Sequence, residues 1–346
     1  MKGLIQSILF GGTLASFGEI RMNQLQAIGT HNSYHLAPNP GVIKFYQVFS
    51  KEAEAWNYSR ESFEVQLSRG VRQIELDVFA DPDGGLYAHP GHPRIAEMKK
   101  PGTKVLHVPK LDARSRYDSF CGALTALRDW SIKNPRHIPV MVLVELKDAK
   151  EVPFGPRPIR FNREQIENLE TEVLSVFQHN EIIKPDDVRK GFKTLREAIL
   201  KRGWPLLKET RGKVFFCLDN EGHHRELYLK GNRALEERLM FVSVNSDHPA
   251  AAFMKRNDPE RGFADIQNLV RSGFIVRTRA DANLKEAREN NQRRAQRALA
   301  SGAQYISTDF PVADPKISSY EVRLPNKTVA RPNPVSGLNI QLQELE

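Results

Sequence analysis

The feature that most limits the fold of this 346-residue chain is a repeated alternation of short apolar runs and longer amphipathic stretches. Each run has the length of a buried strand and each stretch that of a helix, and the pair recurs about seven times at roughly 30-residue spacing. This order is typical of parallel sheets, in which helices connect successive strands. We therefore expect an α/β fold, a single distorted TIM (β/α)8-type barrel. An open doubly wound sheet is the alternative, but no glycine-rich phosphate loop follows the first strand.

Several of the expected strands end in polar side chains. The first apolar run, residues 25–28, breaks at Gly29 and is followed by His31 and Asn32. Barrel enzymes carry their chemistry at the carboxyl ends of the strands, so these side chains are expected to share one cavity. The later strand ends contribute Glu75 and Asp77, Glu145 and Lys147, Asp219 and Asn220, Arg277 and Arg279, and Asp309.

The acidic residues in this set indicate a hard cation. Glu75 and Asp77 are two residues apart, so on a strand both point to one face. With Asn32 and Glu145 they supply only oxygen ligands, which suit calcium or magnesium better than zinc. A Glu-x-Asp pair taken alone more often forms salt bridges at the rim of a barrel. The metal site is favoured because separate strand ends all supply compatible oxygen ligands.

Two histidines could flank whatever such a metal binds. His31 follows the first strand, and His89 follows the turn at residues 81–85. A cation with two imidazoles suits in-line displacement at a phosphate, because the cation neutralises the phosphoryl oxygens while the imidazoles take up and deliver protons.

The formal charge of +9 and the pI near 9.5 are compatible with an ordinary solvated surface or with an anionic partner. No zinc-finger spacing, RNP-like aromatic motif or basic-region helix is present, so we expect no nucleic-acid partner. After the N-terminal segment no stretch could span a bilayer, so any membrane contact would be peripheral. We expect a monomer.

The chain ends differ in composition from the middle. Residues 1–18 combine Lys2, a short apolar run and small residues, which resembles a secretory signal. We therefore expect a secreted protein, the alternative being a cytoplasmic protein peripheral to a membrane. Residues 19–310 are expected to form the catalytic barrel. Residues 311–346 are rich in proline and asparagine and should form an extension that packs on the barrel or trails from it.

Some local predictions are tested below. Helical periodicity predicts helices over residues 42–66, 250–255 and 282–300. Short apolar runs predict strands over residues 213–219, 239–244, 274–279 and 304–309. Cys217 lies in an apolar strand, where a buried free thiol is expected, although a single disulfide with Cys121 stays possible.

The motifs in this order resemble a known family. Gly29-Thr-His-Asn-Ser-Tyr34, Ile74-Glu-Leu-Asp-Val78, His89 and Val144-Glu-Leu-Lys147 look like the X-domain core of phosphoinositide-specific phospholipases C, and nearest to the calcium-dependent, secreted microbial branch. Three later segments fit the same branch: residues 211–220, 276–281 and 300–309. The resemblance covers residues 24–333.

The resemblance implies a distorted TIM barrel that cleaves the glycerol side of a phosphodiester with calcium. Asn32, Glu75, Asp77 and Glu145 would hold the ion. The inositol 2-hydroxyl would attack phosphorus, giving diacylglycerol and a cyclic inositol phosphate. Glu75, Glu145 or a histidine would accept the hydroxyl proton, His31 would stabilise phosphoryl charge, and His89, with His92 as a rival, would protonate the leaving oxygen. Candidates for phosphate and inositol contacts are Lys147, Asp219, Arg277 and Arg279, the two arginines alternatively pairing with Asp281 or Asp309.

Two rival functions remain open. A glycerophosphodiester phosphodiesterase has a similar second strand but usually opens with His-Arg-Gly, whereas this chain has His31-Asn32. A non-catalytic barrel that binds inositol lipids would not be expected to keep both histidines and all four ligands.

Overall fold

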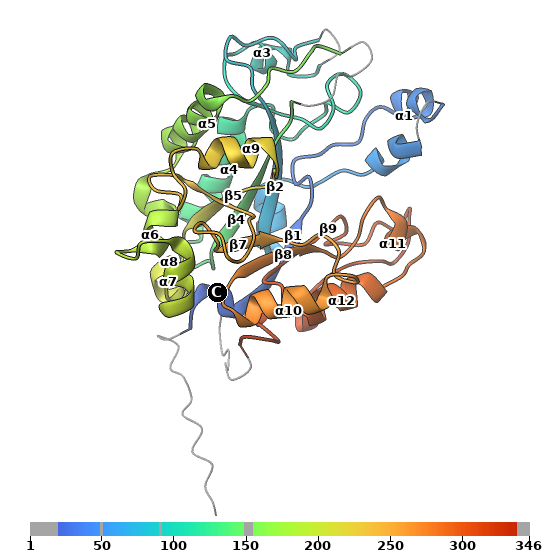
Figure 1. Cartoon of the computed structure of the whole chain (residues 1–346). Coiled ribbons are helices and arrows are strands. Elements are labelled where there is room, and N and C mark those ends of the chain that lie inside the picture. The colour runs from blue at the N-terminus through green and yellow to red at the C-terminus, as the bar shows by residue number, and fades with distance from the viewer. Residues whose placement is uncertain (1–19, 49–50, 90–91, 149–154, 338–346) are drawn as a thin grey trace, which may run out of the picture.

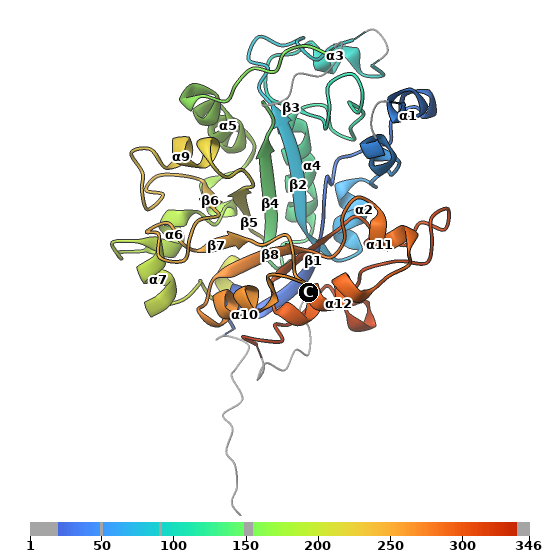
Figure 2. The ribbon, with the colours of Figure 1, turned by 45° about the vertical axis from the view of Figure 1, so that its right-hand side comes forward.

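The computed structural model describes residues 20–48, 51–89, 92–148 and 155–337. The expected signal segment, residues 1–18, lies outside this described part of the chain. Figure 1 shows the whole molecule, and Figure 2 shows it after a turn of 45° about the vertical axis.

Eight parallel strands form a nearly closed barrel in the order β6-β5-β4-β2-β1-β9-β8-β7. The two end strands, β6 and β7, are linked by a parallel bridge between Ser243 and Phe253. The prediction of a distorted TIM barrel is confirmed (Figures 1 and 2). The strands are β1 (Leu25–Thr30), β2 (Val71–Phe79), β4 (Val140–Leu146), β5 (Val214–Leu218), β6 (Met240–Val242), β7 (Phe253–Lys255), β8 (Ile275–Arg279) and β9 (Tyr305–Thr308).

Two further strands add to the barrel sheet in antiparallel orientation. β3 (Lys104–Val105) pairs with the end of β2, and β10 (Ala330–Pro332) pairs with the start of β1. β10 follows a stretch in which Tyr320, Val322 and Leu324 are buried. The described part of the C-terminal segment, up to residue 337, therefore lies against the barrel.

Helices cover the outside of the barrel (Figure 1). The longest, α4 and α5, are capped by Ser119 and Asn162, whose side-chain oxygens accept a hydrogen bond from the first turn. The helices are α1 (Pro40–Gln47), α2 (Phe63–Ser68), α3 (Ile95–Met98), α4 (Phe120–Lys133), α5 (Arg163–Val176), α6 (Pro185–Arg189), α7 (Leu195–Lys201), α8 (Leu207–Thr210), α9 (His223–Leu229), α10 (Phe263–Arg271), α11 (Lys285–Arg288) and α12 (Arg293–Ser301). The 3-10 turns among the described residues span Met22–Gln24, Lys51–Trp56, His179–Glu181 and Pro325–Lys327.

Three predicted helices were wrong in extent or type. Residues 42–66 form α1, a 3-10 turn and α2, and the extended residues before α2 carry Arg60 into the barrel mouth. Residues 253–255 are strand β7, not helix, because hydrogen bonds to β8 close the barrel and outweigh the helix propensity of the alanines before them. The helix at residues 282–300 is broken into α11 and α12 at Asn290, whose φ of 47° is left-handed.

Both cysteines are free thiols, and Cys217 is buried in β5 as expected. Burial raises the pKa of the Cys217 thiol well above its usual value, so the group is an inert part of the core. No helix in the described residues is both long and apolar enough to cross a bilayer.

Candidate active site

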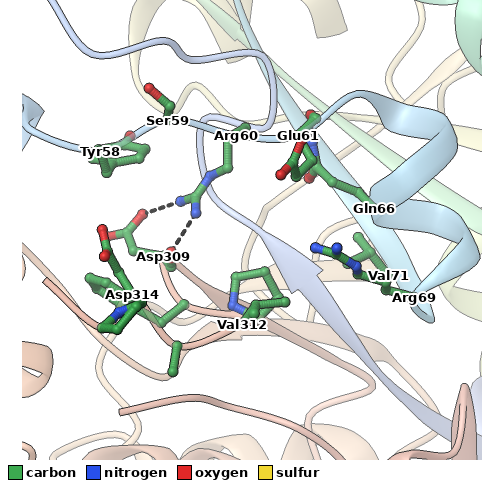
Figure 3. Close-up of a pocket in the computed structure, with 14 residues that line it drawn as sticks. Tyr58, Ser59, Arg60, Glu61, Gln66, Arg69, Val71, Asp309, Val312 and Asp314 are labelled. Carbon is green, nitrogen blue, oxygen red and sulfur yellow. Dashed lines mark hydrogen bonds and ion pairs between the residues drawn. The ribbon is translucent and has the colours of Figure 1, made fainter. Parts of the chain in front are cut away.

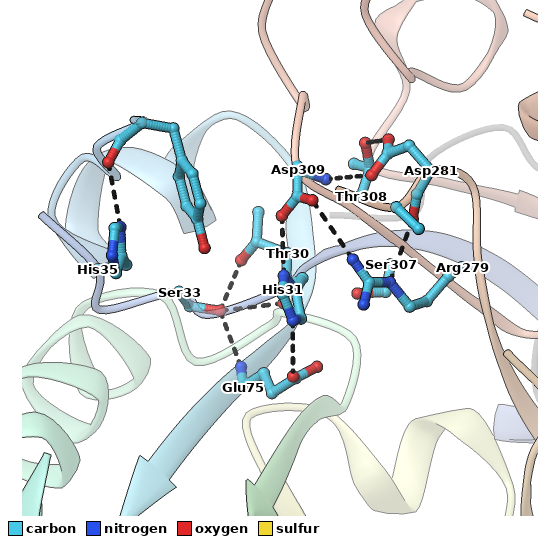
Figure 4. A network of polar contacts seen from close by, with 12 residues as sticks. Thr30, His31, Ser33, His35, Glu75, Arg279, Asp281, Ser307, Thr308 and Asp309 are labelled. Atoms are coloured by element: carbon cyan, nitrogen blue, oxygen red, sulfur yellow. Dashed lines mark hydrogen bonds and ion pairs between the residues drawn. The ribbon is translucent and has the colours of Figure 1, made fainter. Parts of the chain in front are cut away.

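The loop after β1 is held against β2 by close packing and by hydrogen bonds. A Cβ on Gly29 would lie 2.2 Å from Gln73 Oε1, so only glycine permits this approach. Ser33 then donates its N–H to Glu75 O (3.0 Å), and its Oγ accepts from Glu75 N (2.8 Å). Asn32 has φ 43°, a left-handed conformation that asparagine tolerates. The turn therefore sets His31 beside Glu75 on β2 (Figure 4).

His31 is fixed between Asp309, directly after β9, and Glu75, in the middle of β2. Its Nδ1 lies 2.9 Å from Asp309 Oδ1, and its Nε2 lies 3.6 Å from Glu75 Oε1 (Figure 4). Arg60 braces the pair, since its guanidinium donates to His31 O at 2.9 Å and to Asp309 Oδ1 at 2.8 Å. Asp309, a residue that the sequence placed only at a strand end, therefore orients the imidazole.

The charges around His31 favour the neutral ring. Burial and the nearby Arg279 lower the pKa of His31 to about 3, although Asp309 acts in the opposite direction. Burial alone would raise the pKa of Asp309, but contacts with His31, Arg279 and Arg60 hold it well below its usual range. Because ionised Asp309 can only accept, Nδ1 carries the proton and Nε2 presents a lone pair towards Glu75.

Three of the four predicted metal ligands form one cluster. Single carboxylate oxygens of Glu75, Asp77 and Glu145 all lie within 4.8 Å of one another. Lys147 enters the same cluster, with its Nζ 2.9 Å from Glu145 Oε2 and 3.0 Å from Asp77 Oδ2. The structure thus gathers the carboxylates from β2 and β4 as the sequence predicts, and it places Lys147 among them as a counter-charge.

The cluster has the properties of a hard-cation site. Burial raises the pKa of Glu75 to about 8 and that of Asp77 to about 7, although Arg277 and Lys147 oppose these shifts. Buried carboxylates of this kind need a positive charge to remain ionised. Asn32 Oδ1 and Asp77 Oδ1 are buried oxygens without a hydrogen-bond partner. An oxygen-only donor set with unpartnered oxygens fits calcium.

The two arginines of β8 lie on the same face of the strand but have different partners. Arg277 is buried and donates to Glu75 Oε2 at 2.6 Å, to Ser307 Oγ at 3.0 Å and to Asn257 Oδ1 at 2.5 Å. Arg279 donates to Asp309 Oδ2 at 3.3 Å and to the backbone oxygen of Asp281 at 3.1 Å. The alternative expectation, that the arginines pair with Asp309 or Asp281, therefore holds for Arg279. Arg277 instead pairs with Glu75, one of the candidate metal ligands.

Asp219 at the end of β5 pairs with a lysine that the sequence reasoning did not single out. Lys255 Nζ, on β7, lies 2.9 Å from Asp219 Oδ2. Lys255 was missed because its segment was assigned to a helix. The adjacent Asn220 fastens the end of β4, accepting from Leu146 N at 2.7 Å and donating to Leu146 O at 3.0 Å.

His89 is not joined to these groups. Within the described residues, no hydrogen bond or ion pair links it to His31 or to the carboxylates. Its ring lies 5.5 Å from that of His92, and burial together with Lys110 lowers its pKa. Its role as the second imidazole stays a prediction.

A different histidine cluster borders the site, and the sequence reasoning missed it. Asp112 accepts from His107 Nδ1 (2.7 Å) and lies 2.8 Å from His35 Nε2. The His35 ring stacks 4.4 Å from Tyr58, over which the guanidinium of Arg60 lies at 4.5 Å. The cluster therefore reaches His31 through Tyr58 and Arg60. The spacing His107-x4-Asp112 directly after β3 is the signal that could have found it.

A hollow of about 230 Å³ opens on the other side of Asp309. It lies between the segment containing Tyr58 and Arg60 and the chain after β9, which includes Val312 and Asp314 (Figure 3). None of the three clustered carboxylates lines it. The carboxylate cluster therefore lies outside this hollow.

The fold is that of a TIM-barrel enzyme, with a carboxylate cluster, an oriented histidine and guanidinium groups at the mouth of the barrel. The model of the family described as phosphoinositide phospholipase C, Ca2+-dependent, matches residues 20–334, and the chain belongs to this family. It is a phosphoinositide phospholipase C.

Solved structures agree with the fold. A calcium-dependent phosphoinositol-specific phospholipase C from Pseudomonas sp., in an apo form described as a myoinositol complex, is 15% identical with a TM-score of 0.55, over 91% of this chain and 96% of that one. A calcium-dependent phosphatidylinositol-specific phospholipase C from Streptomyces antibioticus is 16% identical with a TM-score of 0.52, over 84% and 95%. No curated protein sequence matches the chain significantly.

Proposed function

We propose that the protein cleaves phosphatidylinositol, or a related inositol phosphodiester, in a calcium-dependent reaction that yields diacylglycerol and a cyclic inositol phosphate. The observation that carries the proposal is the carboxylate cluster of Glu75, Asp77 and Glu145 beside the Asp309-oriented His31. A site that held only a cation would not need an imidazole with a free lone pair 3.6 Å from one of the ligands.

Asn32, Glu75, Asp77 and Glu145 would hold the ion. Calcium, when bound, supplies positive charge for the phosphoryl oxygens and for the hydroxyl that attacks. The ammonium of Lys147 now compensates Asp77 and Glu145, so it must leave the cluster and becomes available to the substrate phosphate. Arg277 keeps Glu75 in place through Oε2.

His31 presents an unprotonated ring nitrogen, and an anionic phosphate bound beside Arg279 would raise its low pKa and so favour proton uptake. Asp309 holds its Nδ1–H, so Nε2 can take the proton of the inositol 2-hydroxyl as that oxygen bonds to phosphorus. Glu75 lies 3.6 Å away and is the alternative acceptor. His31 Nε2 and Glu75 Oε1 face each other, so the hydroxyl would bind between them.

The bond from phosphorus to the glycerol oxygen must then break, and that oxygen needs a proton from a second imidazole. His89 is the candidate from the sequence. His107 is the candidate that the contacts favour, because Asp112 holds its Nδ1 as Asp309 holds that of His31. The side chain of His107 is 22% exposed, so the ring is not fully enclosed.

The remaining polar groups of the mouth are suited to the anionic and hydroxyl groups of the headgroup. Lys147 and Arg279 are partly exposed, and both would contact phosphate. Asp219, with Lys255, would bind inositol hydroxyls. Arg277 is buried, so it would not contact the substrate and would act by holding Glu75 in position.

The substrate is a lipid, so the protein would act at a membrane surface as a peripheral, secreted monomer. Helix α1 stands away from the barrel body (Figures 1 and 2) and exposes Phe45 and Val48 next to Lys44. Apolar side chains flanked by a lysine are suited to the interface of an anionic bilayer.

The test is phosphorus NMR of the products formed from phosphatidylinositol vesicles, with EGTA and with calcium added back. We expect a cyclic inositol phosphate signal that appears only with calcium. His31→Ala should abolish the signal, and His89→Ala and His107→Ala should show which ring protonates the leaving oxygen. Formation of an open inositol phosphate without a cyclic species, or turnover in EGTA, would contradict the proposal.

A further inference from the structure

Asp309, which orients His31, lies one residue beyond the strand ladder of β9. The last residue of β9 that pairs with β1 is Thr308, and the last that pairs with β8 is Ser307. The backbone N–H of Asp309 donates instead to a side chain, at 2.7 Å from Oδ1 of Asp281 (Figure 4). The peptide that carries this carboxylate is therefore held by another carboxyl group and not by the sheet.

Asp281 holds both residues at the end of β9. It has no solvent exposure, and its Oδ2 accepts from Thr308 Oγ1, which in turn accepts from Phe310 N at 2.9 Å. Its Oδ1 can accept from Asp309 N whether or not the carboxyl group is ionised, so the contact does not depend on titration. Asp281 thus ties the chain after β8 to the residue that orients the imidazole.

The chain after the barrel supports this arrangement from outside. Tyr320 has no solvent exposure, and its Oη lies 3.3 Å from Asp281 Oδ2 and equally far from the backbone oxygen of the preceding residue. Its ring meets that of Phe310 edge-on, with the centroids 5.7 Å apart. Two residues later, Val322 N donates to Phe310 O at 2.8 Å. The returning segment therefore supports Asp309 on both sides, through Asp281 before it and Phe310 after it.

We propose that Tyr320 and Asp281 are positioning residues for the reaction at His31. Both are buried, so neither would touch the substrate. They act by fixing the peptide of Asp309, which keeps its Oδ1 at 2.9 Å from His31 Nδ1. The effect on turnover rests on the proposed function, because an imidazole that has lost its orientation no longer presents Nε2 to the attacking hydroxyl. The hold on Asp309 itself does not rest on it.

A purely structural role is the alternative, and Tyr228 provides the comparison. It is as buried as Tyr320, and its hydroxyl donates to Glu170 while accepting from Met240 N at 2.8 Å. Met240 begins β6, so this contact lies at the end of the barrel opposite the mouth. Loss of either hydroxyl should lower stability, but only the loss at Tyr320 should reach His31.

The direct test is proton–nitrogen NMR of the full chain labelled with 15N-histidine, in EGTA at about pH 7. His31 is assigned by the signal lost in His31→Gln. The wild-type Nδ1–H signal should show the downfield shift of a hydrogen bond to a carboxylate. Tyr320→Phe and Asp281→Ala should reduce this shift or lose the signal to exchange with water, and Tyr228→Phe should leave it in place. An unchanged His31 signal in both variants overturns the inference.

The second arm measures kcat and KM on phosphatidylinositol vesicles. Tyr320→Phe should lower kcat by roughly tenfold and leave KM nearly unchanged. The loss is not complete because Arg60 and Arg279 still hold the carboxylate of Asp309. Tyr228→Phe should keep the wild-type kcat even where it lowers the urea midpoint by as much. A wild-type kcat in both Tyr320→Phe and Asp281→Ala contradicts the positioning role.

A double variant separates positioning from a general loss of structure. In the Asp309→Asn protein, Tyr320→Phe should lower kcat by less than about twofold, because both changes act through the same contact. A loss as large as in the wild-type background shows that Tyr320 does not act through Asp309 and overturns the inference. If the wild-type protein cleaves no inositol lipid, the proposed function fails, while the NMR arm still decides whether Tyr320 and Asp281 hold Asp309 against His31.

Discussion

The ammonium of Lys147 lies 3.0 Å from Oδ2 of Asp77, a carboxylate with no solvent exposure. The same nitrogen lies 2.9 Å from Glu145, two residues earlier on the chain. The end of β4 thus supplies both a carboxylate and the cation that balances it. Calcium bound at this cluster would take over that task, so the lysine and the ion compete for the same carboxylates.

Lys147→Met should therefore destabilise the calcium-free protein far more than the calcium-loaded one. Removing one partner of a buried pair costs about 3 kcal/mol, and we expect a loss of this order in EGTA and a much smaller one with saturating calcium. Urea unfolding under both conditions measures it. Lys201→Met is the matched control, since its exposed pair with Glu197 contributes little in either condition. Equal losses with and without calcium would contradict the competition.

Calcium binding should depend on pH between about 6 and 8. Burial raises the pKa of Glu75 to about 8 and of Asp77 to about 7, so in the calcium-free protein both take up protons that the ion must displace. An acid whose pKa is raised on folding destabilises the fold as pH climbs from its unfolded value, near 4, through its folded value. Calcium relieves this cost, so the calcium-induced rise in Tm should grow from pH 6 to pH 8. Titration calorimetry in two buffers should show proton release, and a pH-independent affinity would contradict the assignment.

Asp309→Asn should lower kcat by about 10²–10⁴-fold, because the amide no longer fixes the Nδ1–H tautomer of His31. The shape is kept, so KM should change little, but the charge lost opposite Arg60 and Arg279 should lower the urea midpoint. Asp314→Asn changes a carboxylate that lines the same hollow beyond Asp309 (Figure 3) and should leave kcat unchanged. If Asp309→Asn keeps wild-type turnover, His31 does not act through Nε2.

The sequence predicted the barrel and its polar mouth because both follow from local signals. Buried strands show as apolar runs, and Glu75 and Asp77 share a face through the two-residue repeat of a strand. The parallel register then sets Asp77 opposite Glu145 on β4, a relationship that any parallel pairing of these runs tends to produce.

What the sequence missed depends on contacts between distant segments. β7 has only three residues and follows a run of alanines, whose helix propensity led to a helix being predicted there. Both this barrel strand and Lys255 on it were therefore missed. Arg60, His107 and Asp112 lie outside the barrel strands, in connections whose course no periodicity describes. Their roles are set by where those connections fold back over the mouth, which is a tertiary property.

Helix α1 offers a prediction about the membrane. The side chains of Phe45 and Val48 are 56% and 79% exposed, on a helix that follows the turn carrying His31. The double variant Phe45→Ser/Val48→Ser should weaken binding to phosphatidylinositol vesicles by roughly tenfold, about 1.4 kcal/mol, since only part of the benefit of full burial is gained at an interface. Turnover of a monomeric short-chain substrate should not change. Ile132→Ser is the matched control: Ile132 is 55% exposed but lies at the end of α4, just before the start of β4 and therefore at the opposite end of the barrel. Equal effects of the two changes on vesicle binding would place the membrane contact elsewhere.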